Sequence, residues 1–218
     1  MAHSTLPGPG PVFATVPVDS DSGATHLSGL NPSLLQDLMR FESEHPPGQG
    51  LDLLEVTAAA LRHKRDLLLH LMFDTEPLSV TLLPGARQLV CALPLRQLLG
   101  LRLSELRVLR VEPARHALPG DPEPQPLSPF VWELALRGAR AQLLPEIAGA
   151  AAYRANPGLD LSALPASGSL AHAVQQLRRQ ALSLRELTAQ PGFDADRATR
   201  LLNGLYLHAG LIVTRSGH

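Results

Sequence analysis

Residues 169–215, SLAHAVQQLRRQALSLRELTAQPGFDADRATRLLNGLYLHAGLIVTR, carry the strongest local signals in the chain. Three residues of types that favour helix N-caps each precede an amphipathic run: Ser169, Ser183 and Asp194. Gly192 ends the second run and Gly210 ends the third, as glycines commonly do after helices. The β-branched Ile212 and Val213 then favour a strand. The stretch therefore predicts three short helices followed by a strand.

This order resembles the winged helix-turn-helix domains of bacterial regulators, which pair a short second helix with a tight turn and a third helix. The resemblance is carried by Leu182–Phe193, Leu201–Tyr206 and Gly210–Val213. It covers about a fifth of the chain and, at superfamily level, implies a fold more than a function. In DNA-binding members the third helix lies in the major groove.

Two features depart from the DNA-binding pattern. Eight residues follow Gly210, which is enough for one strand but not for the hairpin of a wing. The exposed face of the third helix is expected to carry Asp196, Arg197, Thr199, Arg200 and Asn203. Carboxylates near the start of this helix would repel phosphates. From Ser169 onward six Arg stand against three Asp or Glu, a net charge of +3, which is mild for a DNA-binding module.

We therefore expect a bacterial, cytoplasmic regulatory or adaptor protein that acts through protein–protein contacts, either with itself as a homodimer or with another protein. A DNA-binding transcriptional regulator is the alternative, and an enzyme of unknown type is a third, less favoured class. The candidate residues for binding a partner or nucleic acid are Arg178, Arg179, Arg185, Arg197, Thr199, Arg200 and Asn203. In the DNA alternative the arginines contact phosphates, and Thr199 or Asn203 reaches bases.

The composition argues against several other classes. The chain has 218 residues, of which 44% are hydrophobic and 18% charged, as in globular proteins of one or two domains. Subtracting the +3 of the C-terminal stretch from the total of −1 leaves −4 for residues 1–168, so that part has no basic footprint for nucleic acid. No run approaches 18 apolar residues, and no Lys or Arg precedes residue 40, which argues against a membrane span and a secretory signal.

The search for chemistry gives no catalytic, cofactor or metal residue. The sequence contains no phosphate-binding loop, no Gly-x-Ser-x-Gly and no His-Glu-x-x-His motif. Its single cysteine, Cys91, excludes an intramolecular disulfide, is typical of a reducing compartment and is interpreted as a small buried side chain. His63, Asp66 and His70 would share one side of a helix and could bind a metal, but a solvated helix face is the favoured interpretation. The eighteen Arg and one Lys are typical of a GC-rich bacterial genome.

The predicted fold class is α+β, with an antiparallel sheet and flanking helices followed by a small, mostly helical, winged-helix-like domain. The predicted segments are a flexible tail at 1–30, an α+β domain at 31–158 with a Pro-rich loop at 113–129, a linker at 159–168 and the winged-helix-like module at 169–218.

Within the α+β domain, periodicity predicts several helices and strands. Among them are a long helix over Leu51–Phe73, a hairpin of Leu78–Leu82 with Gln88–Leu93, a strand over Phe130–Leu136 with a structural Trp132, and a helix over Pro145–Arg154.

Overall fold

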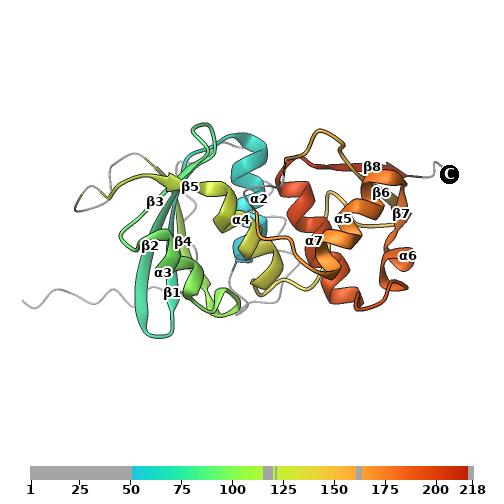
Figure 1. Cartoon of the computed structure of the whole chain (residues 1–218). Coiled ribbons are helices and arrows are strands. Elements are labelled where there is room, and N and C mark those ends of the chain that lie inside the picture. Colours follow the sequence, from blue (N-terminus) through green and yellow to red (C-terminus); the bar gives the residue numbers. More distant parts are fainter. Residues whose placement is uncertain (1–50, 115–119, 121, 161–163, 216–218) are drawn as a thin grey trace, which may run out of the picture.

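The computed structural model describes residues 51–114, 120, 122–160 and 164–215, so the predicted tail at 1–30 lies outside the described residues. Two units lie side by side (Figure 1). The first contains α2 (Leu53–His63), β1 (Leu67–Phe73), β2 (Glu76–Leu83), β3 (Gln88–Cys91), α3 (Leu95–Gly100), the 3-10 helix η1 (Leu103–Glu105), β4 (Arg107–Pro113), β5 (Gln125–Pro126) and α4 (Leu127–Arg137). The second contains β6 (Ala151–Ala155), α5 (Ser169–Arg179), β7 (Leu182–Ser183), α6 (Leu184–Thr188), α7 (Ala195–Leu207) and β8 (Leu211–Arg215). Mixed helices and antiparallel sheets confirm the α+β class.

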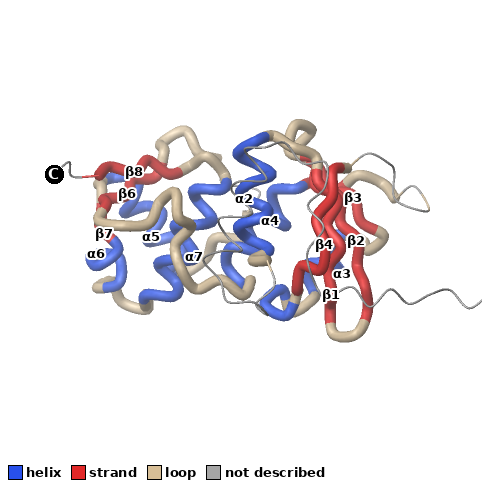
Figure 2. Tube along the Cα trace, turned by 180° about the vertical axis from the view of Figure 1, so that it is seen from behind, coloured by secondary structure: helices blue, strands red, loops and turns tan. Residues whose placement is uncertain are grey.

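The first unit is built on a five-stranded sheet with the order β4-β1-β2-β3-β5, in which all neighbours are antiparallel. Its central strand β1 alternates, with Leu67, Leu69 and Leu71 fully buried on one face. Helices α2 and α4 cover that face (Figure 2). The predicted hairpin of β2 and β3 is confirmed, with Val80 opposite Cys91.

The predicted helix over Leu51–Phe73 is wrong in its second half. Helix α2 ends at His63 because Lys64 adopts a left-handed conformation with φ of 49°, and the Arg65 N–H then bonds the Ala60 carbonyl. The leucines that follow also fit a helical period, but they pair with β2 and β4 as strand β1. His63, Asp66 and His70 therefore do not share a helix face.

The predicted strand over Phe130–Leu136 is also wrong, because this segment is helix α4. Phe130, Trp132, Leu134 and Leu136 alternate as in a strand, but Val131 and Ala135 between them are buried as well. Burial at 127, 130, 131, 134 and 135 is the 3.6-residue period of a helix face. Trp132 is fully buried, so its predicted structural role agrees with its position. The predicted Pro-rich loop ends earlier than expected, because Gln125–Pro126 forms β5 and α4 begins at Leu127.

The predicted helix over Pro145–Arg154 is wrong too, because its second half is strand β6. This strand lies at the centre of a three-stranded sheet with the order β7-β6-β8. Tyr153 pairs with Leu182 on one side and with Val213 on the other. The predicted division into domains thus separates β6 from both of its sheet partners.

The predicted helices and strand of the C-terminal stretch are confirmed. We predicted Ser169 as the N-cap of the first helix. The N-cap of α5 is Gly168 instead, so the helix begins at Ser169, one residue earlier than predicted. Ser183 caps α6 in a reciprocal capping box with Glu186, and the side chain of Asp194 caps α7. The short sequence signals therefore locate these ends within one residue.

A nearly buried arginine joins α2 to the segment that follows α4. The side chain of Arg140 is 8% exposed, and its guanidinium lies 2.9 Å from Asp52 and forms a second ion pair with Glu55. It also donates to the Gln142 and Leu143 carbonyls, each at 2.8 Å. These charge-assisted bonds fix the course of residues 140–143 next to the second unit.

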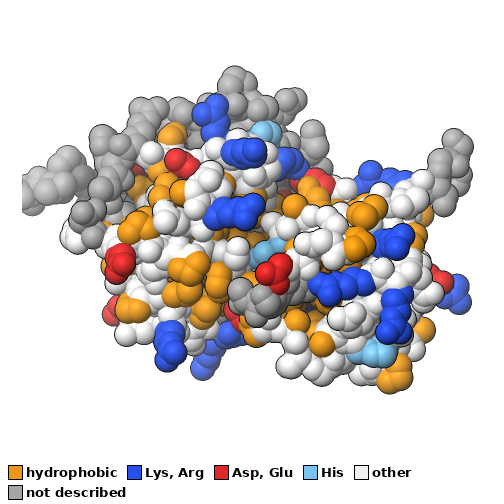
Figure 3. Space-filling view, turned by 45° about the horizontal axis from the view of Figure 1, so that its top comes forward, with side chains coloured by type: hydrophobic (Ala, Val, Ile, Leu, Met, Phe, Trp, Pro, Cys, Tyr) orange, Lys and Arg blue, Asp and Glu red, His pale blue; other side chains and the backbone are white. Residues whose placement is uncertain are grey.

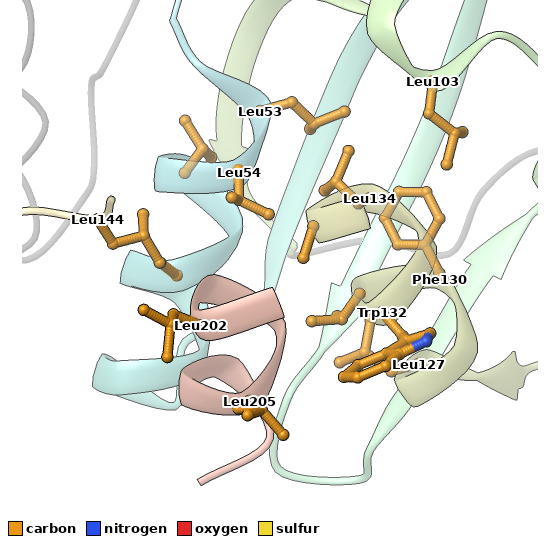
Figure 4. Close-up of a cluster of buried hydrophobic side chains, with 14 of the residues drawn as sticks. Leu53, Leu54, Leu103, Leu127, Phe130, Trp132, Leu134, Leu144, Leu202 and Leu205 are labelled. Carbon is orange, nitrogen blue, oxygen red and sulfur yellow. The ribbon is translucent and has the colours of Figure 1, made fainter. Parts of the chain in front are cut away.

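One continuous hydrophobic core runs through both units. Figure 4 shows Leu202 and Leu205 of α7 beside α2 and α4, near Leu54 and Trp132. All four side chains are at most 2% exposed, and burying one leucine contributes roughly 1.5–3 kcal/mol. At the closest approach, a Cβ added to Gly204 would lie 3.1 Å from the ring of Trp132. A glycine at this position therefore allows α7 to contact α4.

We expect Gly204→Leu to destabilise the protein by about 1–3 kcal/mol, because the new side chain overlaps the Trp132 ring. The free energy of unfolding in urea measures this effect. Gly100→Ala is the control, since a Cβ there meets no atom within 4 Å. Equal stability of Gly204→Leu and the control would contradict the close contact between α4 and α7.

Candidate functional site

Helix α7 is the third helix of the C-terminal stretch and is buried on more than one face. Ala198, Leu201 and Leu205 belong to the core and are fully buried, as the helical pattern predicted. Thr199 and Asn203 are also buried, with exposures of 5% and 0%. Buried polar side chains require hydrogen-bond partners, so the surroundings of this second face decide what α7 can do.

Asn203 makes two bonds to the segment after α4. Its side-chain oxygen accepts from the Leu144 N–H at 2.9 Å, and its side-chain nitrogen donates to the Gln142 carbonyl at 2.9 Å. Both amide groups are therefore used inside the protein, as the geometry of a buried amide requires. Asn203 serves as a tether between α7 and the segment after α4.

Arg200 caps the C-terminal end of α4. One guanidinium nitrogen donates to the Gly138 carbonyl at 2.7 Å and to the Leu136 carbonyl at 3.3 Å, and the Nε bonds Asp196 at 2.7 Å. A cation at this position stabilises the free carbonyls and the negative end of the helix dipole. Its side chain is 17% exposed, so Arg200 belongs to the same internal contact.

His208 and Trp132 close the other end of this contact. Their rings meet edge to face, with centroids 5.6 Å apart. The His208 Nδ1 lies 2.8 Å from the Gly204 carbonyl, and its Nε2 lies 3.2 Å from the Ser128 carbonyl. The Trp132 indole donates to the Pro165 carbonyl at 3.2 Å. The contacts of His208 with Trp132 and Ser128, and of Trp132 with Pro165, join residues far apart along the chain, and nothing in the local sequence signals them.

The predicted exposed face of the third helix is therefore wrong for Thr199 and Asn203. We expected both side chains to point outward, but both are buried, and Asn203 bonds the backbone of Gln142 and Leu144. Neither residue can reach the edge of a base while this packing holds. Of the other three residues predicted on this face, Asp196 and Arg197 are exposed, whereas Arg200 is partly buried.

The remaining candidate residues line the outside of the second unit. Arg179, Arg185 and Arg197 are exposed, and Arg197 donates to the Gly192 carbonyl at 2.7 Å. Arg178 is half-buried and donates to the Leu159 carbonyl at 2.7 Å. Figure 3 shows Lys and Arg side chains spread over one face of both units, with fewer Asp and Glu among them. The structure thus leaves Arg179, Arg185 and Arg197 exposed, places Arg178 and Arg200 partly inside, and buries Thr199 and Asn203.

Acidic side chains occupy the starts of α6 and α7. The Ser183 backbone N–H and hydroxyl both bond the Glu186 carboxylate at 2.7 Å and lower the pKa of that carboxyl. Asp194 accepts from the Arg197 N–H at 2.8 Å. Glu186 and Asp194 thus bring negative charge to the helix starts where a phosphate would otherwise be favoured.

Burial changes the acidity of three side chains that can take part in chemistry. Cys91 is 2% exposed, and burial raises the pKa of its thiol more than the Leu93 N–H lowers it. Burial likewise raises the pKa of the Tyr153 and Tyr206 hydroxyls. Within the described ranges, no group of three His, Cys, Asp or Glu residues is placed to hold a metal ion.

Comparisons with protein-family models, curated proteins and solved structures gave no match for this chain. In the part of the chain that the structure describes, no helix is both long enough and apolar enough to cross a membrane. The interpretation of the site therefore depends on its own geometry.

We expect Asn203→Ala to destabilise the protein by about 1–3 kcal/mol, because it leaves the buried Leu144 N–H without its acceptor. The measurement is the free energy of urea unfolding. Arg197→Ala, on the exposed side of the same helix, is the control and should change stability by less than about 0.5 kcal/mol. Comparable, small effects of both substitutions would contradict the internal role of Asn203.

Proposed function

We propose that this chain is a cytoplasmic, bacterial regulatory or adaptor protein whose C-terminal part is a winged-helix-like module used for protein contact. The observation that carries the proposal is the burial of Thr199 and Asn203 on α7, where Asn203 is bonded to the segment after α4. A helix held in this way is unavailable to the major groove. The module's remaining polar surface is open to a protein partner.

The winged-helix resemblance is supported by the order of elements. A helix, a short strand, two helices and a further strand follow one another as α5, β7, α6, α7 and β8. The turn between α6 and α7 contains Gly192 with φ of +73°, which suits a tight turn. Strand β6 contributes the central strand of the sheet from the segment before α5.

A DNA-binding regulator is the second candidate, because Arg179, Arg185 and Arg197 are exposed and could contact phosphates without α7 entering a groove. Their neighbours Glu186, Asp194 and Asp196 reduce the local positive charge. Mixed charge of this kind is more typical of protein-binding surfaces than of phosphate-binding ones.

We expect the purified protein to leave the fluorescence anisotropy of a labelled random DNA duplex unchanged at low salt, since the groove-reading face of α7 is covered. Micromolar binding that falls steeply with salt, and that weakens in an Arg179→Ala, Arg185→Ala, Arg197→Ala triple variant, would favour the DNA-binding alternative.

We also expect the same triple variant to lose contact with its protein partner. Chemical cross-linking in the source cells followed by mass spectrometry measures this loss. The control triple variant carries Arg87→Ala, Arg96→Ala and Arg102→Ala, which remove equal charge from exposed sites of the first unit. Equal loss of a partner in both variants would place the contact outside the module's arginines.

A further inference from the structure

Strand β8 has an edge to which no described residue pairs. It lies at the end of the three-stranded sheet and pairs with β6 alone. The Asn156 N–H donates to the Gly210 carbonyl at 2.8 Å. Along an antiparallel strand, the backbone N–H and C=O groups of successive residues point alternately to the two sides. The backbone groups of Ile212 and Thr214 therefore face β6, like those of Gly210. The backbone groups of Leu211, Val213 and Arg215 face away from β6.

The other sheet edges carry features that oppose pairing with another chain. Strand β4 has three charged side chains, Arg107, Arg110 and Glu112, and its pairing with β1 contains a bulge. Strands β5 and β7 have two residues each, and β5 contains Pro126. Such short strands, charges, bulges and prolines are the usual protection of sheet edges.

Strand β8 has little of this protection. It is five residues long, has no proline, pairs with β6 without a register shift and carries one charge, Arg215, at its end. Its Ile212 is 47% exposed and is one of two large hydrophobic side chains so exposed among the described residues. An apolar, unbulged and unpaired edge is a template for a further strand.

We propose that β8 is a homodimer interface, where β8 of a second copy adds antiparallel about a two-fold axis at Val213. The sequence of the strand fits itself in this register. Val213 faces its own counterpart, Ile212 lies beside Thr214 of the second copy, and Arg215 lies opposite Leu211. No like charges are opposed within the pair, and the outward-facing backbone groups find partners.

This inference rests on the proposed protein-contact function, since it names a second copy of the chain as one partner. The two can fail separately. A monomer that still binds another protein through its arginines would overturn the dimer and leave the proposed function intact.

The test is the molar mass of the full chain, measured by light scattering over a range of concentrations for three variants and the wild type. Ile212→Lys places a charge at the interface. Val213→Pro removes a backbone donor that faces the open edge without removing a bond to β6. Leu109→Lys is the matched control, because Leu109 is also 47% exposed but lies on the protected strand β4.

We expect the wild type and Leu109→Lys to approach twice the chain mass of 23.4 kDa as concentration rises. Ile212→Lys and Val213→Pro should raise the dissociation constant at least ~10-fold, with circular dichroism spectra like the wild type. A wild type that stays monomeric at every concentration would overturn the proposal. Equal weakening by Leu109→Lys and Ile212→Lys, or undiminished dimerisation of both β8 variants, would overturn it as well.

Discussion

The contact between the Trp132 ring and the backbone of α7 at Gly204 is the constraint on which the rest of the structure depends. A side chain at position 204 would crowd this contact, because its Cβ would lie 3.1 Å from the ring. Across the same contact Arg200 reaches the end of α4, and Asn203 bonds Gln142 and Leu144. The two units share one core, and Arg200 and Asn203 of α7 hold them together.

Elements were predicted correctly where the residues that determine them lie close together in the sequence. The capping residues Ser183 and Asp194 act within a few positions, so the helices that follow them begin where expected. The predictions for the segments around Leu69 and Trp132 were wrong because leucine-rich and aromatic runs fit both the helical and the strand period. In those segments tertiary packing decides between helix and strand, and a short window of sequence does not contain that information.

The candidate site shows the same limit more strongly. Exposed arginines such as Arg179 and Arg185 lie outside as expected, because charged side chains on amphipathic helices favour solvent. The buried side chain of Asn203 is bonded to partners about sixty positions earlier in the chain, whose approach no local pattern signals. A polar residue in mid-helix is equally consistent with a binding surface and with an internal tether.

The position of β6 has a consequence for synthesis of the chain. Translation completes Ala151–Ala155 before either of the strands that flank it, and β8 is made after β7. Until residue 215 leaves the ribosome, β6 has at most one strand to pair with. Unpaired edges of this kind favour aggregation of nascent chains. Slow translation or chaperone binding between residues 155 and 211 would therefore change how long this edge stays open.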